Sequence, residues 1–194
     1  MEEKKLFKVS SNPLVRTKRD TTSIMLDVII ALIPALAVGT YMFGIKVVLL
    51  LAVNVFACVF FEWGYRKLLK KPQSVGDLSA VVTGFLLTCV LPSEATWWMG
   101  VIGSFFAIVV VKQLYGGIGK NFLNPALAGR AFLTAGYAAV MTSWAVPTTL
   151  AGVVDGTTMA TPLSYLKAGE ALPEYFDLTS LFLGGVPGSI GEIS

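Results

Sequence analysis

Residues 24–65 read IMLDVIIALIPALAVGTYMFGIKVVLLLAVNVFACVFFEWGY, and this stretch decides the fold. The hydrocarbon core of a bilayer is about 30 Å thick, so a helix needs about 20 apolar residues to cross it. Residues 24–43 and 45–65 each form an apolar run of that length, although the first contains Asp27 and Pro34. The stretch therefore predicts two consecutive membrane-spanning helices.

Further apolar segments follow at residues 78–91, 96–115 and 126–146, and another begins near Leu178. Segment 78–91 is short, because at about 1.5 Å per residue it reaches only about 21 Å as a helix. We therefore expect an all-α integral membrane protein whose helical bundle has about five spans within residues 24–146.

The composition supports contact with lipid and excludes several kinds of chemistry. Of the 194 residues, 55% are hydrophobic and only 14% are charged, whereas a soluble domain carries about 25% charged residues. The chain has no histidine, which excludes histidine-based triads, metal sites and proton relays. The net charge of +3 does not indicate nucleic-acid binding, because the basic residues lie beside the apolar segments.

Cys58 and Cys89 both lie within apolar segments and do not have CxxC spacing. We expect them to be small buried side chains. The alternative is a metal or iron–sulfur site that is shared with another subunit.

The distribution of Lys and Arg predicts the orientation, because cytoplasmic loops of membrane proteins are enriched in these residues. With five crossings, all of the 15 basic residues except Lys46 and Lys167 lie on one side. We therefore expect a cytoplasmic tail over residues 1–23 and an extracytoplasmic segment over residues 147–177, in the inner (cytoplasmic) membrane. The cytoplasmic set comprises the basic residues of the tail, those of residues 66–71, and Lys112, Lys120 and Arg130.

Hydroxyl groups interrupt the short third segment at Ser79, Thr83 and Thr88, and Asp77 stands at its start. An acidic residue in the first turn is favoured by the helix dipole. The pattern has two interpretations. The side chains either cap the helix and bond back to its backbone, or they line a polar cavity or cofactor site.

Residues 116–126 read GGIGKNFLNPA and form the connection before the fifth segment. Glycines allow the backbone to approach a ligand closely, and Asn124 can cap a helix that has Pro125 at its first position. Such a helix start presents free N–H groups. The segment is therefore either a plain loop and cap or a ligand site, and it is not a dinucleotide fingerprint, since no strand precedes it.

Residues 155–163 read DGTTMATPL, which by composition is a turn followed by an extended segment. Pro162 directs Thr161 towards β or polyproline geometry. The residues alone do not distinguish this segment from an ordinary hydroxyl-rich loop.

Residues 77–88, 112–126 and 155–163, in this order, resemble segments of one membrane-protein family. It is the family shared by the D subunit of the Rnf complex and the B subunit of the sodium-pumping NADH:quinone reductase. Residues 10–16 and 184–192 resemble the family's amino-terminal start and one of its loops, with Leu14 in place of a common His. The short tail favours the Rnf member and leaves the quinone reductase member as the alternative.

The resemblance implies a covalent flavin. The family's attachment signature corresponds here to Asp155, Gly156, Thr158, Met159, Ala160 and Thr161, with Met159 where Gly is usual. It implies an FMN joined through its phosphate to the hydroxyl of Thr161 by a separate flavin transferase, on the extracytoplasmic segment. Asp155 would be read by the transferase or orient the loop.

The resemblance also implies a role and partners. The chain would relay electrons as one component, not catalytic alone, of an ion-translocating ferredoxin:NAD oxidoreductase. Its partners would be a second flavin-bearing subunit, iron–sulfur subunits and membrane lipid, with no nucleic acid. A further flavin or riboflavin near a subunit interface would involve Asn121 and Asn124. The fold would be the first half, residues 24–146, of a channel-like inverted repeat, and the protein would continue beyond residues 178–194.

Asp27, Glu62 and Asp77 are acidic residues within or at the edge of the expected spans. Such residues are candidates for an ion pathway by default. For Asp27 and Asp77, solvation at the membrane surface is the alternative. The sequence does not distinguish sodium from proton transport.

Two other functions remain open. A passive channel or solute transporter would explain Asn124-Pro125-Ala126, which resembles the half-helix motif of water channels. Those channels carry two such motifs and have no need of the segment from Asp155 to Thr161. The second alternative is an assembly protein without a cofactor.

Overall fold

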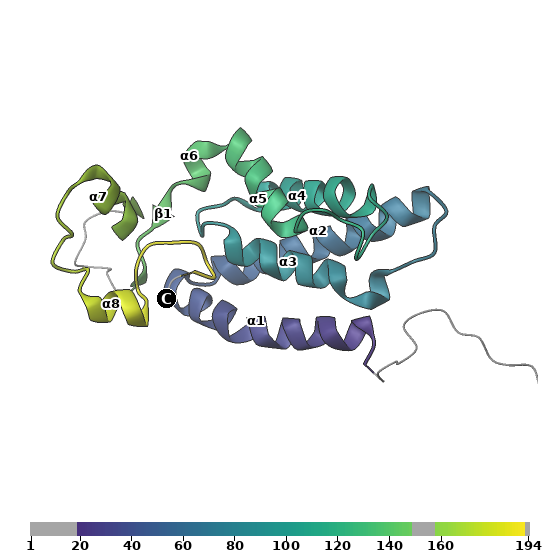
Figure 1. The fold of residues 1–194 in the computed structure, drawn as a ribbon, viewed down its shortest axis with the longest axis horizontal. Helices are drawn as coiled ribbons and strands as arrows, with labels where there is room; N and C mark the ends of the chain where they lie inside the picture. Colours follow the sequence, from purple (N-terminus) through teal and green to yellow (C-terminus); the bar gives the residue numbers. More distant parts are fainter. Residues whose placement is uncertain (1–18, 149–157, 193–194) are drawn as a thin grey trace, which may run out of the picture.

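The computed structural model describes residues 19–148 and 158–192, whose regular secondary structure is helical apart from one two-stranded ladder (Figure 1). Residues 10–16, Asp155 and Gly156, which the sequence singled out, lie outside the described residues. The elements in chain order are α1 (Thr21–Phe43), α2 (Lys46–Leu68), the 3-10 helix η1 (Val75–Asp77), α3 (Ser79–Val90), α4 (Trp97–Phe105), the π-helix η2 (Phe106–Gln113), α5 (Pro125–Gly136), α6 (Ala138–Met141), β1 (Trp144–Ala145), β2 (Thr158–Met159), α7 (Pro162–Ala168) and α8 (Leu178–Leu183).

Helices α1 and α2 confirm the first two expected spans. Each has 23 residues and is apolar and long enough to cross a membrane. Large apolar side chains such as Ile30, Leu49 and Phe56 are more than half exposed on their surfaces. An apolar surface of this extent indicates contact with lipid or with another protein.

Helices α1, α2 and α3, the continuous helix formed by α4 and η2, and α5 alternate in direction, so their connections gather at two ends of the bundle (Figure 1). The start of α1 lies with residues 69–78 and 114–124 at one end, which we call the basic end. A hydrogen bond of 3.4 Å from Thr22 Oγ1 to the carbonyl of Gly76 joins two of these segments. Elements β1, α7 and α8 lie at the opposite end.

Close helix packing in the bundle depends on small residues. A Cβ atom at Gly84 would lie 2.8 Å from Cα of Val55, so α3 and α2 approach each other too closely for a side chain there. A Cβ atom at Gly129 would lie 2.9 Å from the carbonyl oxygen of Gly103, on α4. Small residues permit such contacts between membrane helices, where packing rather than the hydrophobic effect drives association.

The fifth expected span, residues 126–146, is wrong in its length. Helix α5 ends at Gly136, and Tyr137 leaves the helical region with φ −132° and ψ 46°. Glycine lowers the stability of a helix, and further along Trp144 pairs with Met159 in the antiparallel β1–β2 ladder. A residue in such a ladder cannot be helical, so the chain leaves the bundle earlier than its hydrophobicity suggests.

The last described segment returns to the bundle. Backbone N–H groups of Ile190 and Gly191 donate to the carbonyls of Leu91 (3.1 Å) and Cys89 (2.8 Å) at the end of α3. Ile190 is completely buried, and a Cβ atom at Gly39 of α1 would lie 2.6 Å from its carbonyl oxygen. Residues 158–186, which we call the outer lobe, are thus held by the β1–β2 ladder at one end and by this return segment at the other.

Candidate functional site

Thr161, the expected attachment residue, lies in the outer lobe directly before α7. Its backbone is extended, with φ −74° and ψ 155°, as Pro162 predicts. Its hydroxyl oxygen accepts a hydrogen bond of 3.3 Å from the backbone N–H of Ser164 and lies 2.8 Å from the Ser164 hydroxyl. The side chain is half-buried, and Thr158 and Ala160 beside it are exposed. The hydroxyl is therefore accessible and held in one position by the first turn of a helix.

Two groups further along the outer lobe have shifted pKa values. The N–H and hydroxyl of Ser180 hydrogen-bond to Asp177, which caps α8, and lower the pKa of the Asp177 carboxyl. A hydrogen bond with the Tyr165 hydroxyl raises the pKa of Tyr175. Both groups are at the surface, so these shifts describe local hydrogen bonding rather than a reactive centre.

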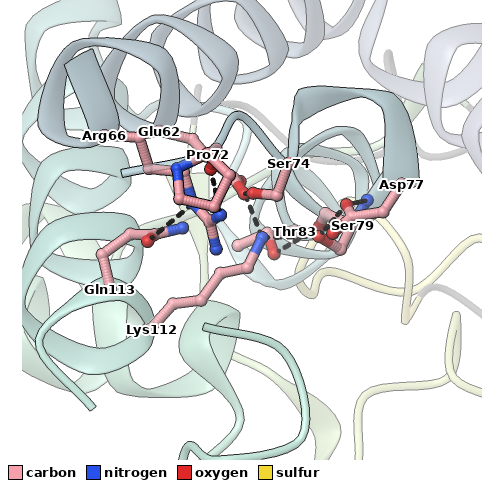
Figure 2. A network of polar contacts seen from close by, with 9 residues as sticks. All are labelled: Glu62, Arg66, Pro72, Ser74, Asp77, Ser79, Thr83, Lys112 and Gln113. Carbon is pink, nitrogen blue, oxygen red and sulfur yellow. Dashed lines mark hydrogen bonds and ion pairs between the residues drawn. The ribbon is translucent and has the colours of Figure 1, made fainter. Parts of the chain in front are cut away.

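A second polar cluster lies inside the bundle towards its basic end (Figure 2). Lys112 Nζ lies 2.7 Å from Glu62 Oε2, and the two side chains are only 3% and 0% exposed. Lys112 Nζ also donates to the hydroxyl of Ser79 at 2.6 Å. Ser79 donates in turn to Asp77, and Ser74 donates to the other oxygen of Glu62. The ammonium group is thus held between oxygen atoms from α2 and α3.

The π-helix η2 brings Lys112 into this position. The N–H of Leu114 donates to the carbonyl of Val109, five residues earlier, at 3.1 Å. The wider turn places Val111, Lys112 and Gln113 all among the buried residues. Short π-helical segments in longer helices are often found at functional sites.

Arg66 fixes the neighbouring connection. Its Nε donates to Gln113 Oε1 at 3.2 Å, and its Nη1 donates to the carbonyl of Pro72 at 2.6 Å. One guanidinium group therefore joins α2, η2 and the connection to η1 (Figure 2).

A cavity of about 340 Å³ opens beside Lys112. The side chains of Ser79, Thr83, Asn121 and Asn124 share its wall with apolar residues and with the Lys112 side chain. Asn124 Oδ1 accepts from the N–H of Ala126 at 3.0 Å, so the expected cap of α5 is confirmed. Ser79 and Thr83 line this cavity, and the hydroxyl of Thr83 also donates to the carbonyl of Ser79 at 2.8 Å. Both interpretations of the α3 hydroxyls therefore describe part of the pattern.

Thr88 differs from the other two hydroxyls of α3. It accepts a hydrogen bond of 2.9 Å from Asn54 Nδ2 and donates to the carbonyl of Gly84. Asn54 and Thr88 are both completely buried between α2 and α3. This pair joins two helices in the centre of the bundle, away from the cavity.

The three acidic candidates have different environments. Asp27 forms an exposed ion pair of 3.3 Å with Arg19. Asp77 lies in η1, before α3 rather than in its first turn as expected, and its carboxylate accepts from the N–H of Ser79 at 2.8 Å. Only Glu62 of the three is buried.

Two basic residues of the expected cytoplasmic set lie inside helices of the bundle. Lys112, which flanks the connection between the fourth and fifth expected spans, is buried against Glu62. Arg130 lies within α5, and its Nη1 is 4.0 Å from the carboxylate of Glu192 in the return segment. Lys112 lies near the end of the apolar segment 96–115, and hydropathy alone does not indicate which face of the helix it occupies. The acidic residue in the second span was the one signal that a buried cation would be needed.

Cys58 and Cys89 are buried and free, in agreement with the expected small buried side chains. Within residues 19–148 and 158–192, no group of three or more Cys, Asp and Glu side chains could hold a metal ion.

The chain is similar to known proteins over almost all of its length. The model of the NQR2, RnfD, RnfE family matches residues 8–194. The D subunit of the Na⁺-translocating ferredoxin:NAD⁺ oxidoreductase complex of Acetobacterium woodii is 54% identical over 189 residues, which are 96% of this chain and 58% of that protein.

Two further relatives carry related descriptions. The D subunit of the proton-translocating ferredoxin:NAD⁺ oxidoreductase complex of Clostridium ljungdahlii is 39% identical, over 99% of this chain and 60% of that protein. The D subunit of an ion-translocating oxidoreductase complex of Rhodobacter capsulatus is 36% identical, over 95% and 59%. The chain thus spans about three fifths of the length of these relatives. On the match along residues 8–194 and on these identities, it belongs to the NQR2, RnfD, RnfE family.

Proposed function

We propose that the chain is part of the D subunit of an ion-translocating ferredoxin:NAD oxidoreductase complex, and that it carries FMN on Thr161. Two of the relatives are named as D subunits of ferredoxin:NAD⁺ oxidoreductase complexes, and the third as the D subunit of an ion-translocating oxidoreductase complex. These names favour the assignment over the quinone reductase member of the family. Bound flavin supplies the electron chemistry, whereas the protein positions it and adjusts its surroundings.

The observation that supports the attachment site is the accessible, fixed hydroxyl of Thr161. An ester oxygen can still accept a hydrogen bond but cannot donate one. The bond from the Ser164 N–H would therefore persist in the phosphoester, and the Ser164 hydroxyl would become the donor to Thr161. The residues present thus fit the proposed group without rearrangement of the helix start.

Flavin fluorescence in a denaturing gel tests the attachment, because only a covalent flavin remains with the protein. The wild-type protein should give a fluorescent band, and Thr161→Val should lose it while the protein stays in the membrane. Thr179→Val, which removes an exposed hydroxyl of the outer lobe outside the attachment signature, is the matched control and should keep the band. A fluorescent band that persists in Thr161→Val would place the attachment at another residue. If the wild-type protein gives no band, the remaining functions are a channel or an assembly protein without a covalent flavin.

We also propose that the basic end faces the cytoplasm and that the outer lobe lies on the other side of the inner membrane. Single cysteines at Lys120 and Glu170, both exposed, probe the two ends. A membrane-impermeant maleimide added to intact cells should label Glu170→Cys and spare Lys120→Cys. The reverse pattern would exclude this orientation.

For the inner cavity, we propose that Asn121 and Asn124 contact a second, non-covalent flavin. Amide side chains can both donate and accept hydrogen bonds, and the polar edge of a flavin ring offers both. Thr161→Val should then retain flavin that is released by denaturation. In Asn121→Ala, loss of that fraction is expected; an unchanged fraction would remove this residue from the site.

A further inference from the structure

The ammonium group of Lys112 lies where a small metal cation would find its ligands. Its two hydrogen-bond acceptors are a carboxylate oxygen of Glu62 at 2.7 Å and the hydroxyl oxygen of Ser79 at 2.6 Å. Hard cations are bound by the same kinds of oxygen ligand. The second oxygen of Glu62 and the proton of Ser79 are engaged by Ser74 and Asp77, which fixes the two acceptors in place.

The burial of Glu62 makes a positive partner necessary. The carboxylate is completely buried within an apolar helix. A single charge left unpaired in such a place is strongly destabilising. The requirement is for one positive charge at these oxygens, and it does not specify whether an ammonium group or a metal ion provides it.

The cavity gives a cation access to the site and gives the lysine another position. Ser79 and Lys112 both line it, whereas Glu62 lies behind them. Thr83 and Asn121 add oxygen atoms to the same wall. The lysine side chain is a flexible four-carbon stem, so its ammonium group can move into the cavity when another cation takes its place.

We propose that Lys112 is a tethered cation that competes with a monovalent metal cation, probed here as Na⁺, for the oxygen atoms of Glu62 and Ser79. The exchange conserves charge, because one positive charge replaces another at Glu62 and the ammonium group moves towards the part of the cavity wall that Ser79 and Thr83 form. Arg66 is engaged with Gln113 and Pro72 and stays in place. The inference deepens the proposed ion-coupled role and rests on it.

Acetylation of Lys112 in native membranes tests this exchange in the wild-type protein. Membranes are treated with acetic anhydride in NaCl or in choline chloride of equal ionic strength, and modification is measured by mass spectrometry. Modification of Lys112 should rise several-fold in NaCl, while that of exposed Lys120 should not change. In Glu62→Gln the dependence on Na⁺ should disappear, and in Asp27→Asn, the matched control, it should remain. Equal modification of Lys112 in both salts would overturn the proposal.

Removal of the tether gives an independent measurement on the full chain purified in detergent. Lys112→Met should unfold at a higher temperature in NaCl than in choline chloride, because a ligand that binds only the folded state stabilises it. The double variant Lys112→Met with Glu62→Gln should show no such difference. If the unfolding temperature of Lys112→Met is the same in both salts, the ion pair between Glu62 and Lys112 is purely structural and the proposal is wrong. If Lys112→Met does not fold, the acetylation of wild-type Lys112 tests the exchange alone. In either case, comparing the flavin fluorescence of Thr161→Val with that of wild type tests the proposed cofactor separately.

Discussion

The two polar regions of this protein are built in opposite ways. The cluster around Glu62 and Lys112 joins three helices, is almost completely buried and is tied together by side-chain hydrogen bonds (Figure 2). Thr161 lies at the surface of the outer lobe, and the bonds of its hydroxyl are to one residue of the same turn. The first region is assembled by the fold, whereas the second presents a short local structure to an external enzyme. Substitutions should therefore have global effects in the first and local effects in the second.

The largest effect is expected from Lys112→Met measured in the absence of metal cations. It leaves the buried carboxylate of Glu62 without a partner, which should lower the free energy of unfolding by about 3–5 kcal/mol. Thermal or chemical unfolding of the full chain in detergent measures this. The double variant with Glu62→Gln should recover most of the loss, since no unpaired charge remains. A single variant as stable as wild type would show that the cluster does not depend on this ion pair.

Asn124→Ala and Thr161→Ala remove equivalent helix caps from the two regions. Each cap is worth about 1 kcal/mol. In Asn124→Ala the loss should lower the unfolding midpoint of the whole protein, because α5 packs into the core through Leu133, which is fully buried. Asn124→Ser, which keeps a capping oxygen, should restore most of it. An unchanged midpoint in the alanine variant would mean that α5 is not part of the cooperative unit.

In Thr161→Ala the loss should stay within α7. Hydrogen exchange should accelerate in the amides of α7, while the unfolding midpoint of the bundle should not move. Thr161→Ser retains the capping oxygen and should exchange like wild type. A fall in the global midpoint similar to that of Asn124→Ala would erase the contrast between the regions.

The smallest effect concerns pH and is confined to α8. Hydrogen bonds from Ser180 lower the pKa of Asp177 in the folded protein. The cap therefore stabilises α8 at pH values above the usual Asp pKa of about 3.9, and this contribution is lost as pH falls through the lowered pKa. Hydrogen exchange of α8, corrected for intrinsic rates, should accelerate on acidification in wild type. Asp177→Asn should exchange with no such pH dependence; an identical response in both would exclude the carboxylate as the cause.

Features set by local sequence could be predicted. The apolar runs predicted α1 and α2, and Asn124-Pro125 predicted the start of α5. A helix begins at the expected Leu178, but α8 ends at Leu183 and is too short to be a membrane span. The extended backbone of Thr161 follows from Pro162 in the same way. These outcomes depend on a few neighbouring residues, which the sequence displays directly.

Features set by contacts between distant segments could not be predicted. The last residues of the expected fifth span are not helical, because Trp144 pairs with Met159 in a ladder whose second strand comes later in the chain. The burial of Lys112 requires both the π-helical turn of η2 and a partner 50 residues away, Glu62. Hydropathy places this lysine near the end of an apolar segment but does not show that it faces a carboxylate on another helix.

The outer lobe has a mechanical consequence for any group bound to Thr161. The lobe is fastened to the bundle at two points, by Met159 against Trp144 and by Ile190 against Leu91. Thr161 is only two residues from the ladder contact of Met159, so its position relative to the bundle is restrained. A group attached to Thr161 can therefore reach only a small volume. A redox partner must approach that volume to exchange electrons with the attached group.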